Sequence, residues 1–233
     1  MPYDNTRLYV IGDIHGRSDL LERLIAAIDR DAGKFGASCL TVTLGDYIDR
    51  GPNSRGVLDR LSVNPFPGNY IALKGNHEAL LETFLVDPAV GAHWWRLGGR
   101  ETMHSFGVRT QTFLGRRSFR KVRDQLRAGL SNEHRRFLAS LKTSFTFGRY
   151  FMCHAGVRPG IPLENQNEED LLWIRDEFLS SKLDFGKIVV HGHTPVEEPE
   201  VLPNRINIDT CAFASGRLTC VVLEDDRHRF ITA

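Results

Sequence analysis

The stretch Arg7-Leu8-Tyr9-Val10-Ile11-Gly12-Asp13-Ile14-His15-Gly16 joins a short apolar run to two polar side chains enclosed by glycines. The apolar run is typical of a buried strand. Asp13 and His15 are two residues apart on an extended segment, so both side chains can point to the same side of the chain. The stretch therefore predicts a strand that delivers two candidate metal ligands where it ends.

Four other polar stretches have the same form, with Asp, Asn or His close to a glycine after an apolar run. They are residues 45–51 (GDYIDRG), 75–78 (GNHE), 154–156 (HAG) and 191–194 (HGHT). Any one of them could be structural, because Asp near a turn commonly bonds its own backbone and glycine permits tight turns. Five together favour one site assembled from separate loops.

Strand, polar loop and helix alternate three times before residue 87. Strands are predicted at 7–11, 38–44 and 70–73. A helix capped by Ser18 would follow the first strand, with one apolar face made of Leu20, Leu21, Leu24, Ile25 and Ile28. This alternation is typical of βαβ units with a mostly parallel sheet, where ligands bind outside the carboxyl ends of the strands.

The second half of the chain is predicted to return to strands. They cover residues 143–147, 150–153, 187–190, 205–209 and 217–223. We expect a single domain over residues 1–233, with a cap-like helical insertion at about 87–141.

Within this insertion, residues 116–136 carry eight Lys or Arg against Asp124 and Glu133. This pattern fits a helical pair with a solvated basic face, and it also fits a cap that raises the local phosphate concentration beside the site. The sequence leaves both interpretations open.

The composition is that of a soluble globular protein, with 41% hydrophobic and 25% charged residues in a chain of 233. A formal charge of +1 argues against a general nucleic-acid or membrane binder. We find no apolar run near the roughly 18 residues of a membrane span, and no signal-peptide pattern at the start of the chain. Four cysteines in apolar contexts without CxxC spacing indicate a reduced, cytoplasmic protein.

The candidate ligands are carboxylate, amide and imidazole groups without a thiolate. This donor set favours Mn, Fe, Zn or Co over copper or a structural zinc. A carboxylate such as Asp46 can bridge two ions, and two ions about 3.5–4 Å apart can clamp an in-line displacement at phosphorus.

The order GDIHG, GDYIDRG, GNHE, HAG and GHT resembles the phosphoprotein phosphatase branch of the calcineurin-like metallophosphoesterases, in particular its compact bacterial and phage-type serine/threonine protein phosphatases. The resemblance spans residue 7 to about 210. It implies an α/β fold in which a β-sandwich is flanked by helices in four αββα layers, rather than the open sheet that the pattern alone predicts. We find no counterpart of the C-terminal tyrosine-bearing loop of the eukaryotic enzymes, so no eukaryotic-type regulatory subunit is implied.

The resemblance implies two divalent metal ions, with manganese expected for activity and iron, zinc or cobalt as alternatives. The first ion would be held by Asp13, His15 and Asp46. Asp46 would bridge to the second ion, whose other ligands would be Asn76, His154 and His193. Pro195 stands where the broader superfamily has a further histidine, and His191 is expected to lie outside the ligand set.

The resemblance also assigns the proton donor. His77 would be the general acid that protonates the leaving oxygen, and Asp49 would orient it. Metal-activated water would attack phosphorus directly, without a phosphoenzyme.

Arg50 and Arg175 resemble the phosphate clamps of the family, in which a planar guanidinium can engage two phosphoryl oxygens. Asn76 is also expected to bind the substrate phosphate. For Arg175 the alternative is a surface ion pair with Asp176 or Glu177. The sequence departs from the resemblance at Cys211, where relatives commonly have glycine.

The expected function is that of a metal-dependent phosphomonoesterase acting on phosphoserine or phosphothreonine, with phosphotyrosine as a further candidate. Its partner would be a phosphorylated protein or a small phosphoester. A symmetrical dinucleoside-tetraphosphate hydrolase is the second hypothesis. Asp49 and Glu78 disfavour it, because the second motif of those enzymes usually has a different residue where Asp49 stands and their third motif ends in GNHD. The third is a non-catalytic metal- or phosphate-binding module, which would not need His77 and Asp49.

Overall fold

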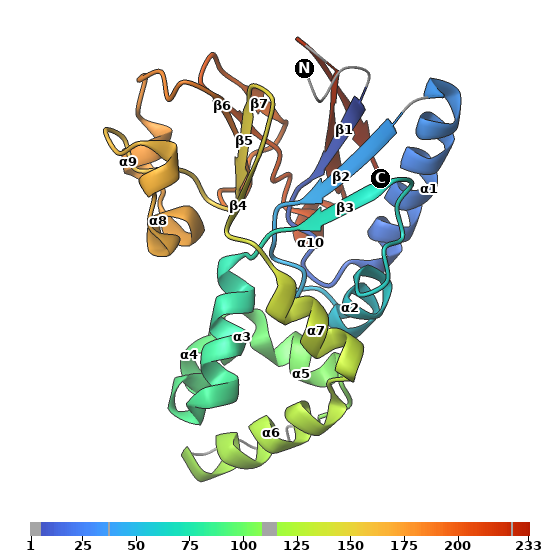
Figure 1. Ribbon diagram of the computed structural model, residues 1–233. Helices are drawn as coiled ribbons and strands as arrows, with labels where there is room; N and C mark the ends of the chain where they lie inside the picture. The colour runs from blue at the N-terminus through green and yellow to red at the C-terminus, as the bar shows by residue number, and fades with distance from the viewer. Residues whose placement is uncertain (1–5, 37, 109–115, 225) are drawn as a thin grey trace.

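A computed structural model of the protein describes residues 6–36, 38–108, 116–224 and 226–233 (Figure 1). Within these ranges the strands form two sheets of five. None of the helices found there is long and apolar enough to cross a membrane.

The first sheet has the order β10-β9-β1-β2-β3. Its strands are β1 (Thr6–Ile11), β2 (Ser38–Thr43), β3 (Asn69–Ala72), β9 (Thr219–Glu224) and β10 (Arg227–Thr232). The first three are parallel, while β9 runs antiparallel to β1 and β10 antiparallel to β9. The carboxyl ends of β1, β2 and β3 therefore lie at one edge.

The second sheet has the order β4-β5-β6-β8-β7. Its strands are β4 (Ser144–Phe147), β5 (Tyr150–Cys153), β6 (Ile188–His191), β7 (Glu200–Val201) and β8 (Arg205–Asn207). Strands β5, β6 and β8 are parallel, and β4 and β5 form the predicted hairpin. The loops after β5 and β6 carry His154 and His193.

The two sheets pack face to face. Alternation along β1 sends Leu8 and Val10 into the core between the sheets, where they meet Met152 and Val190, while Tyr9 faces the outer helices. Helix α1 (Ser18–Phe35) covers the first sheet, with α2 (Ser54–Leu61) beside its lower end, and α8 (Glu168–Trp173) and α9 (Asp176–Leu179) cover the second (Figure 1). The αββα sandwich is confirmed, and the open sheet is wrong because the later strands build a second sheet.

Helix α1 buries the predicted apolar face of Leu20, Leu21, Leu24, Ile25 and Ile28. Its predicted cap is wrong. Arg17 is the N-cap residue, without a side-chain cap bond, and Ser18 is the first helical residue, whose Oγ accepts from Asn53 Nδ2 at 2.8 Å. Gly36 ends the helix in the left-handed region at φ 68°.

A group of helices lies between β3 and β4, below the sheets in Figure 1. It comprises α3 (Asn76–Val86), η1 (Pro88–Val90), α4 (Gly91–Trp94), a π-helical turn η2 (Trp95–Gly99), α5 (Arg100–Ser105), α6 (Arg116–Gly129) and α7 (Asn132–Ser140). Two short elements, η3 (Leu163–Asn165) and α10 (Ala212–Ser215), lie elsewhere in the chain. Residues 109–115 of the predicted insertion lie outside the described residues, and the single-domain organisation stays a prediction.

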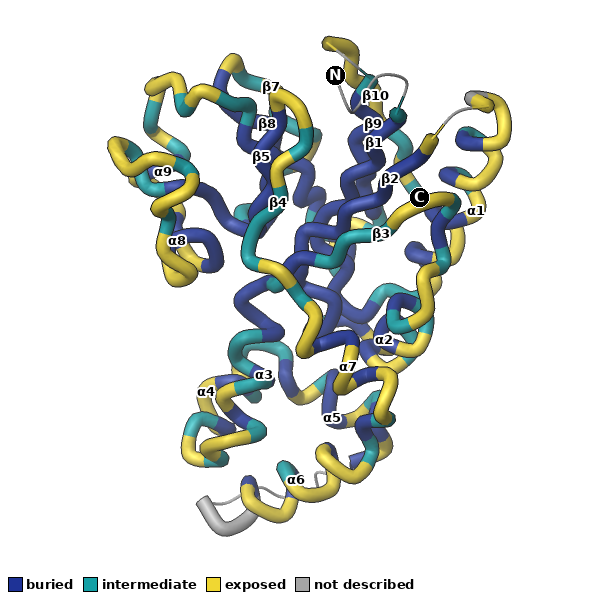
Figure 2. Tube along the Cα trace, in the orientation of Figure 1, coloured by how far each residue is buried: buried dark blue, intermediate teal, exposed yellow. Residues whose placement is uncertain are grey.

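Helix α6 carries most of the predicted basic segment. It lies at the lower end of the molecule, beyond α3, α5 and α7 (Figure 1). Phe119, Val122 and Leu126 are buried against the other helices, while Arg120 and Lys121 are exposed (Figure 2). This placement fits a helix with a solvated basic face rather than a cap over the polar loops.

Candidate two-metal active site

The five polar stretches meet where the carboxyl ends of the strands converge. The main chain already ties them together: the amides of Ile14 and His15 donate to the Asp46 carbonyl at 3.1 and 2.8 Å. In the second sheet the amide of Gly192 donates to the His154 carbonyl at 2.8 Å. The loops after β1 and β2, and those after β5 and β6, are therefore fixed in pairs.

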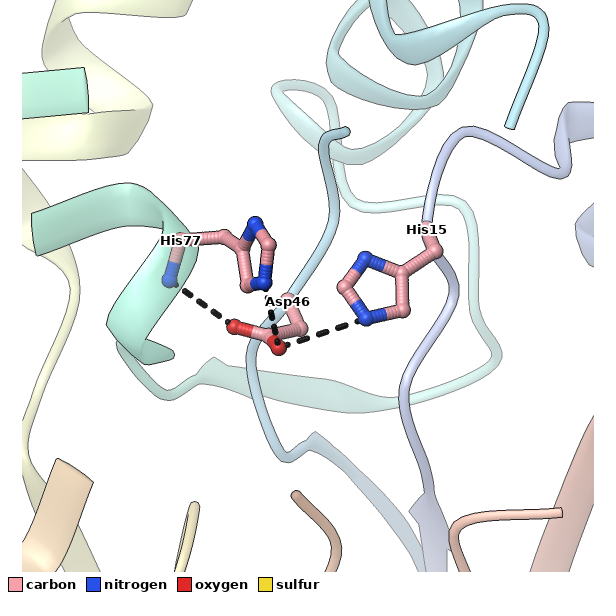
Figure 3. A group of neighbouring side chains, drawn as sticks. All are labelled: His15, Asp46 and His77. Atoms are coloured by element: carbon pink, nitrogen blue, oxygen red, sulfur yellow. Dashed lines mark hydrogen bonds and ion pairs between the residues drawn. The ribbon is translucent and has the colours of Figure 1, made fainter. Parts of the chain in front are cut away.

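The first cluster consists of His15, Asp46 and His77 (Figure 3). Nε2 of His15 and Nε2 of His77 lie 3.4 and 3.9 Å from Oδ2 of Asp46. Nδ1 of His15 lies 2.8 Å from the Ile48 carbonyl, which can only accept, so Nδ1 carries the hydrogen. The lone pair of Nε2 is thus free to bind a cation beside the carboxylate.

The second cluster consists of Asp46, His154 and His193. Nδ1 of His154 donates to the Leu44 carbonyl at 3.0 Å, which leaves Nε2 unprotonated. That nitrogen lies 2.8 Å from Asn76 Oδ1, 3.5 Å from Asp46 Oδ1 and 3.2 Å from His193 Nδ1. His154 Nε2, Asn76 Oδ1 and Asp46 Oδ1 are all acceptors that face one another in a buried site and repel, and a divalent cation between them removes the repulsion. The donor set therefore fits a metal ion.

Asp46 belongs to both clusters, with Oδ2 toward the first and Oδ1 toward the second. Burial alone would raise its pKa, but the nearby imidazoles, with His154 first and then His77 and His15, hold the pKa below its usual range. The side chain is a buried carboxylate with one oxygen for each cluster, which is the arrangement that a bridging ligand needs.

Asp13 lies in neither cluster. Its carboxylate accepts from the His193 amide at 3.2 Å, and a Cβ on Gly192 would stand 2.1 Å from its Oδ1, so only glycine fits there. Burial, and then the charges of Asp209 and Asp46, raise the pKa of Asp13. The structure brings Asp13 to the site, and its role as a ligand of the first ion stays a prediction.

His77 and Asp49 form a buried pair. Nδ1 of His77 lies 2.6 Å from Oδ2 of Asp49, and neither side chain is more than 1% exposed. Burial lowers the pKa of His77, but the carboxylates of Asp46 and Asp49 outweigh it and raise the pKa overall. Nε2, on the other side of the ring, faces the first cluster and accepts from Arg50 Nη2 at 3.2 Å when the ring is neutral. The pair has the geometry of a proton donor supported by a carboxylate.

A family model for calcineurin-like phosphoesterases matches residues 6–221, nearly the whole length of the chain. The chain belongs to the calcineurin-like phosphoesterase family. Membership and the two side-chain clusters together support a two-metal site in a hydrolase.

Several curated proteins resemble this phosphoesterase along most of its length. Asymmetrical bis(5'-nucleosyl)-tetraphosphatase PrpE of Anoxybacillus flavithermus is 26% identical, covering 91% of this chain and 88% of its own. Serine/threonine-protein phosphatase 2 of Escherichia coli is 28% identical, covering 91% of this chain and 90% of its own. The relatives thus carry two different substrate names.

Solved structures share the fold. A structure described as a putative diadenosine tetraphosphatase superimposes with a TM-score of 0.69 at 20% identity, covering 97% of this phosphoesterase and 93% of its own chain. A cold-active protein-tyrosine phosphatase of a Shewanella species gives 0.61 at 16% identity, covering 100% and 82%.

The two predicted phosphate-binding arginines of the phosphoesterase lie in different settings. Arg50 is partly buried, with its guanidinium carbon 5.0 Å from the centre of the Phe213 ring. Arg175 is exposed, and its Nη1 donates to Thr194 Oγ1 at 3.0 Å. The alternative ion pair is not found among the described residues, where Glu177 pairs with Arg158 at 3.1 Å. The charges of both arginines act to lower the pKa of Asp209 beside the site.

Glu78 holds the loop that carries Asp46 through hydrogen bonds to its main chain. Its carboxylate accepts from the amides of Asp46 and Tyr47, both at 2.8 Å, and of Gly75 at 3.0 Å. Burial and the charge of Asp46 raise the pKa of Glu78 to about 8. Sequence reasoning used Glu78 only to compare motifs, whereas in the structure it fixes the loop that carries the shared ligand.

Asp209 is a buried carboxylate that sequence reasoning missed. Burial raises its pKa to about 6, and its Oδ1 accepts from the Cys211 amide at 2.9 Å. The other polar stretches were found by their glycines, and here Cys211 occupies the left-handed position at φ 57° where a glycine would have marked the loop. The left-handed backbone is present at Cys211, but the sequence has no glycine there that would reveal it.

His191 lies outside both clusters. It is fully buried, its Nδ1 lies 3.1 Å from the Gly192 carbonyl, and its ring packs edge-on against Phe178. Burial lowers its pKa to about 3.

The site backbone is strained. Five site residues other than glycine adopt left-handed angles: His15 (φ 43°), Asp46 (52°), Asp49 (72°), Arg50 (66°) and His193 (65°). Each such residue costs on the order of 1–3 kcal/mol, and strain of this kind gathers at functional sites. The surrounding contacts hold these residues in positions that the isolated loops would avoid.

Proposed function

We propose that this phosphoesterase is a two-metal phosphomonoesterase that acts on phosphoserine or phosphothreonine in proteins, with phosphotyrosine and small phosphoesters as further candidates. The observation that carries the proposal is the buried 2.6 Å contact between His77 Nδ1 and Asp49 Oδ2. A serine or threonine alkoxide is a poor leaving group and needs a proton as the P–O bond breaks. A nucleotide leaves as a polyphosphate anion, which needs far less help.

Each residue then has a task. His15, Asp46, Asn76, His154 and His193 would hold the ions, with Asp13 beside them. Two divalent ions there would neutralise phosphoryl charge and lower the pKa of a water molecule.

The remaining polar groups act on the substrate. Arg50 and Arg175 would orient the phosphoryl group through guanidinium hydrogen bonds, and Asn76 would also contact it. His77 would deliver its Nε2 proton to the leaving oxygen, while Asp49 stabilises the imidazolium form before transfer.

Substitution of the acid tests the proposal. In His77→Asn, kcat on a phosphoserine peptide should fall by about 10²–10⁴-fold. The loss on p-nitrophenyl phosphate should be much smaller, because p-nitrophenolate leaves without protonation. Steady-state kinetics on both substrates, at one metal concentration, measure the two ratios. If kcat on the phosphopeptide barely changes, His77 is not the acid.

The second candidate is a dinucleoside-tetraphosphate hydrolase. The relative named as an asymmetrical tetraphosphatase matches 91% of the chain, whereas a symmetrical tetraphosphatase of Acidovorax matches only 27% of it. Comparison of kcat/KM for diadenosine tetraphosphate and for a phosphopeptide decides between the classes. A non-catalytic binding module is rejected by clear turnover of p-nitrophenyl phosphate with added Mn²⁺.

We also propose manganese as the activating metal and the cytoplasm as the compartment. The four cysteines form no disulfide, as a reducing compartment requires. Chelation followed by re-addition of Mn²⁺, Fe²⁺, Zn²⁺ or Co²⁺ ranks the metals by recovered activity. A nucleic acid, a membrane or a eukaryotic-type regulatory subunit is not part of the proposal.

A further inference from the structure

The Asp49 carboxylate is held by two residues of the helices that follow α3. Nε1 of Trp94 donates to Oδ2 at 2.7 Å, the same oxygen that meets His77. The Thr102 hydroxyl donates to Oδ1 at 2.5 Å. Asp49, Trp94 and Thr102 are all fully buried. Both oxygens of the carboxylate are therefore occupied by donors that cannot be replaced by bulk water.

We propose that Trp94 and Thr102 are positioning residues for the general acid. They fix the Asp49 carboxylate so that its Oδ2 meets His77 Nδ1, and this directs Nε2 of His77 toward the leaving oxygen. The inference rests on the proposed monoesterase function and extends it to the helical segment at residues 91–105. That segment sets how well the enzyme handles substrates with poor leaving groups.

The direction of the Thr102 hydroxyl follows from its neighbours. Its oxygen lies 2.9 Å from the Asp49 amide, which can only donate, so Thr102 accepts there. Asp49 Oδ1 can only accept, so the single hydroxyl hydrogen of Thr102 goes there, and the Ser54 hydroxyl, 2.9 Å away, donates to Thr102. The Asp49 amide also donates to Ser54 Oγ at 3.0 Å. Thr102 thus holds both the main chain and the side chain of Asp49, at a residue whose φ of 72° is unfavourable.

Trp94 is held equally firmly. Its indole packs on Phe84 with ring centres 4.9 Å apart, and a Cβ on Gly99 would stand 2.5 Å from the indole ring. The indole has no other hydrogen to donate, so its N–H serves Asp49 alone. A ring locked in this way restricts the carboxylate to one rotamer.

The turn between Trp94 and Thr102 contacts Arg50, which is predicted to bind the substrate phosphate. The Arg50 amide donates to the Gly98 carbonyl at 3.2 Å, and a Cβ on Gly98, at φ 116°, would stand 2.6 Å from that amide nitrogen. One short segment, from Trp94 to Thr102, therefore supports Asp49 and Arg50 together.

The test removes each donor while keeping the shape of the side chain. Trp94→Phe loses the N–H and keeps an aromatic ring, and Thr102→Val loses the hydroxyl and keeps the volume. Each should lower kcat on a phosphoserine peptide by about 10- to 100-fold, with a much smaller loss on p-nitrophenyl phosphate and little change in KM. Thr102→Ser, which retains the hydroxyl, should restore most of the activity. In the Asp49→Asn background, Trp94→Phe should cause no further loss.

A second readout does not need turnover. In the metal-free protein, the indole N–H resonance that disappears in Trp94→Phe should shift in Asp49→Asn. The downfield His77 Nδ1–H resonance should weaken in Trp94→Phe and in Thr102→Val, and should return in Thr102→Ser.

Equal losses on both substrates, with an unchanged His77 resonance, would mean that Trp94 and Thr102 are merely structural, and would overturn the inference. If Trp94→Phe does not fold, the comparison of Thr102→Val with Thr102→Ser decides by the same criteria. Absence of wild-type turnover on either phosphomonoester would instead defeat the proposed function, and the resonances would still show whether the two donors fix the Asp49–His77 pair.

Discussion

Three histidines of the site each have one ring nitrogen that points away from the site, and the group that this nitrogen contacts differs among them. In His15 and His154 that group is a main-chain carbonyl, of Ile48 and of Leu44. A carbonyl fixes the tautomer and leaves the ring neutral, which suits a metal ligand. In His77 the corresponding partner is the Asp49 carboxylate, whose charge favours the imidazolium form. The hydrogen-bond partner of the ring therefore distinguishes the predicted metal ligands from the predicted general acid, although all are histidines.

The Asp49 charge should be visible in the pH dependence. The pKa of His77 is raised, against burial, by Asp46 and Asp49. As the proposed general acid, His77 would act in its protonated form, which persists to higher pH, and kcat should fall as the pH rises through that pKa. Asp49→Asn removes one of the charges that raise the pKa of His77. The alkaline limb of the kcat–pH profile on a phosphopeptide should therefore shift to lower pH by about 1 unit or more. An unmoved limb in full pH–rate profiles of both proteins would contradict this account.

The sequence was informative for residues that lie inside a motif. Short spacing between polar residues and glycines was enough to nominate His15, Asp46 and His154. Trp94 and Thr102 reach Asp49 across 45 and 53 positions of the chain, and no local pattern encodes a contact at such separations.

Among single elements, α1 shows how a periodic pattern becomes stability. Its apolar stripe lies against the outer face of the first sheet, and Leu24 is fully buried there. Burial of this kind, repeated along one face, stabilises a helix that would be marginal in isolation.

Truncation of this stripe should destabilise the protein without touching the chemistry. Leu24→Ala should lower the free energy of unfolding by about 2–5 kcal/mol, through lost burial and the cavity left behind. Arg23→Ala, at a neighbouring exposed position of the same helix, is the matched control and should change it by about 0.5 kcal/mol or less. Urea denaturation followed by circular dichroism measures both. Similar midpoints for the two variants would show that the stripe adds little.

Elements with strong periodicity were predictable, and those without it were not. Strand β10 has the sequence RHRFIT and is mostly exposed at the edge of the first sheet, so it lacks the apolar run that marks a buried strand. Strand β7 has only two residues, Glu200 and Val201, too few for any pattern. Both were missed for the same reason: pairing with a neighbour, rather than burial, makes them strands.

For the molecule as a whole, the site joins the two sheets. His15 and Asp46 follow strands of the first sheet, while His154 and His193 follow strands of the second. The sequence alone could not place these strands in separate sheets, because both halves show similar apolar runs. The family resemblance predicted the β-sandwich, whereas the local sequence pattern favoured one open sheet.

Metal should therefore stabilise the whole fold. An ion that binds only the folded protein adds about 2.7 kcal/mol at 100 times its Kd, and each 1 kcal/mol raises Tm by about 2–4 °C for a chain of this size. Mn²⁺ added to chelator-treated protein should raise Tm accordingly in differential scanning calorimetry.

Asp46→Asn should abolish most of that increase, because it alters the residue shared by both clusters. Asp176→Asn, an exposed carboxylate in α9, is the control and should retain it. An equal increase in all three proteins would indicate binding elsewhere.

The convergence of ligands at one end of the sandwich makes the two ends of the molecule unequal. Bound metal ions would tie together the carboxyl ends of β1, β2, β5 and β6. Their amino ends would gain no such tie; they are held by side-chain packing and ladder hydrogen bonds, and in β1 also by the ion pairs of Arg7 with Asp31 and Glu224. Thermal opening of the loaded protein should accordingly start at the amino ends, near Thr6, Ser38 and Ile188. Amide hydrogens there should exchange with solvent faster than those beside the site, giving a gradient of local stability along each strand.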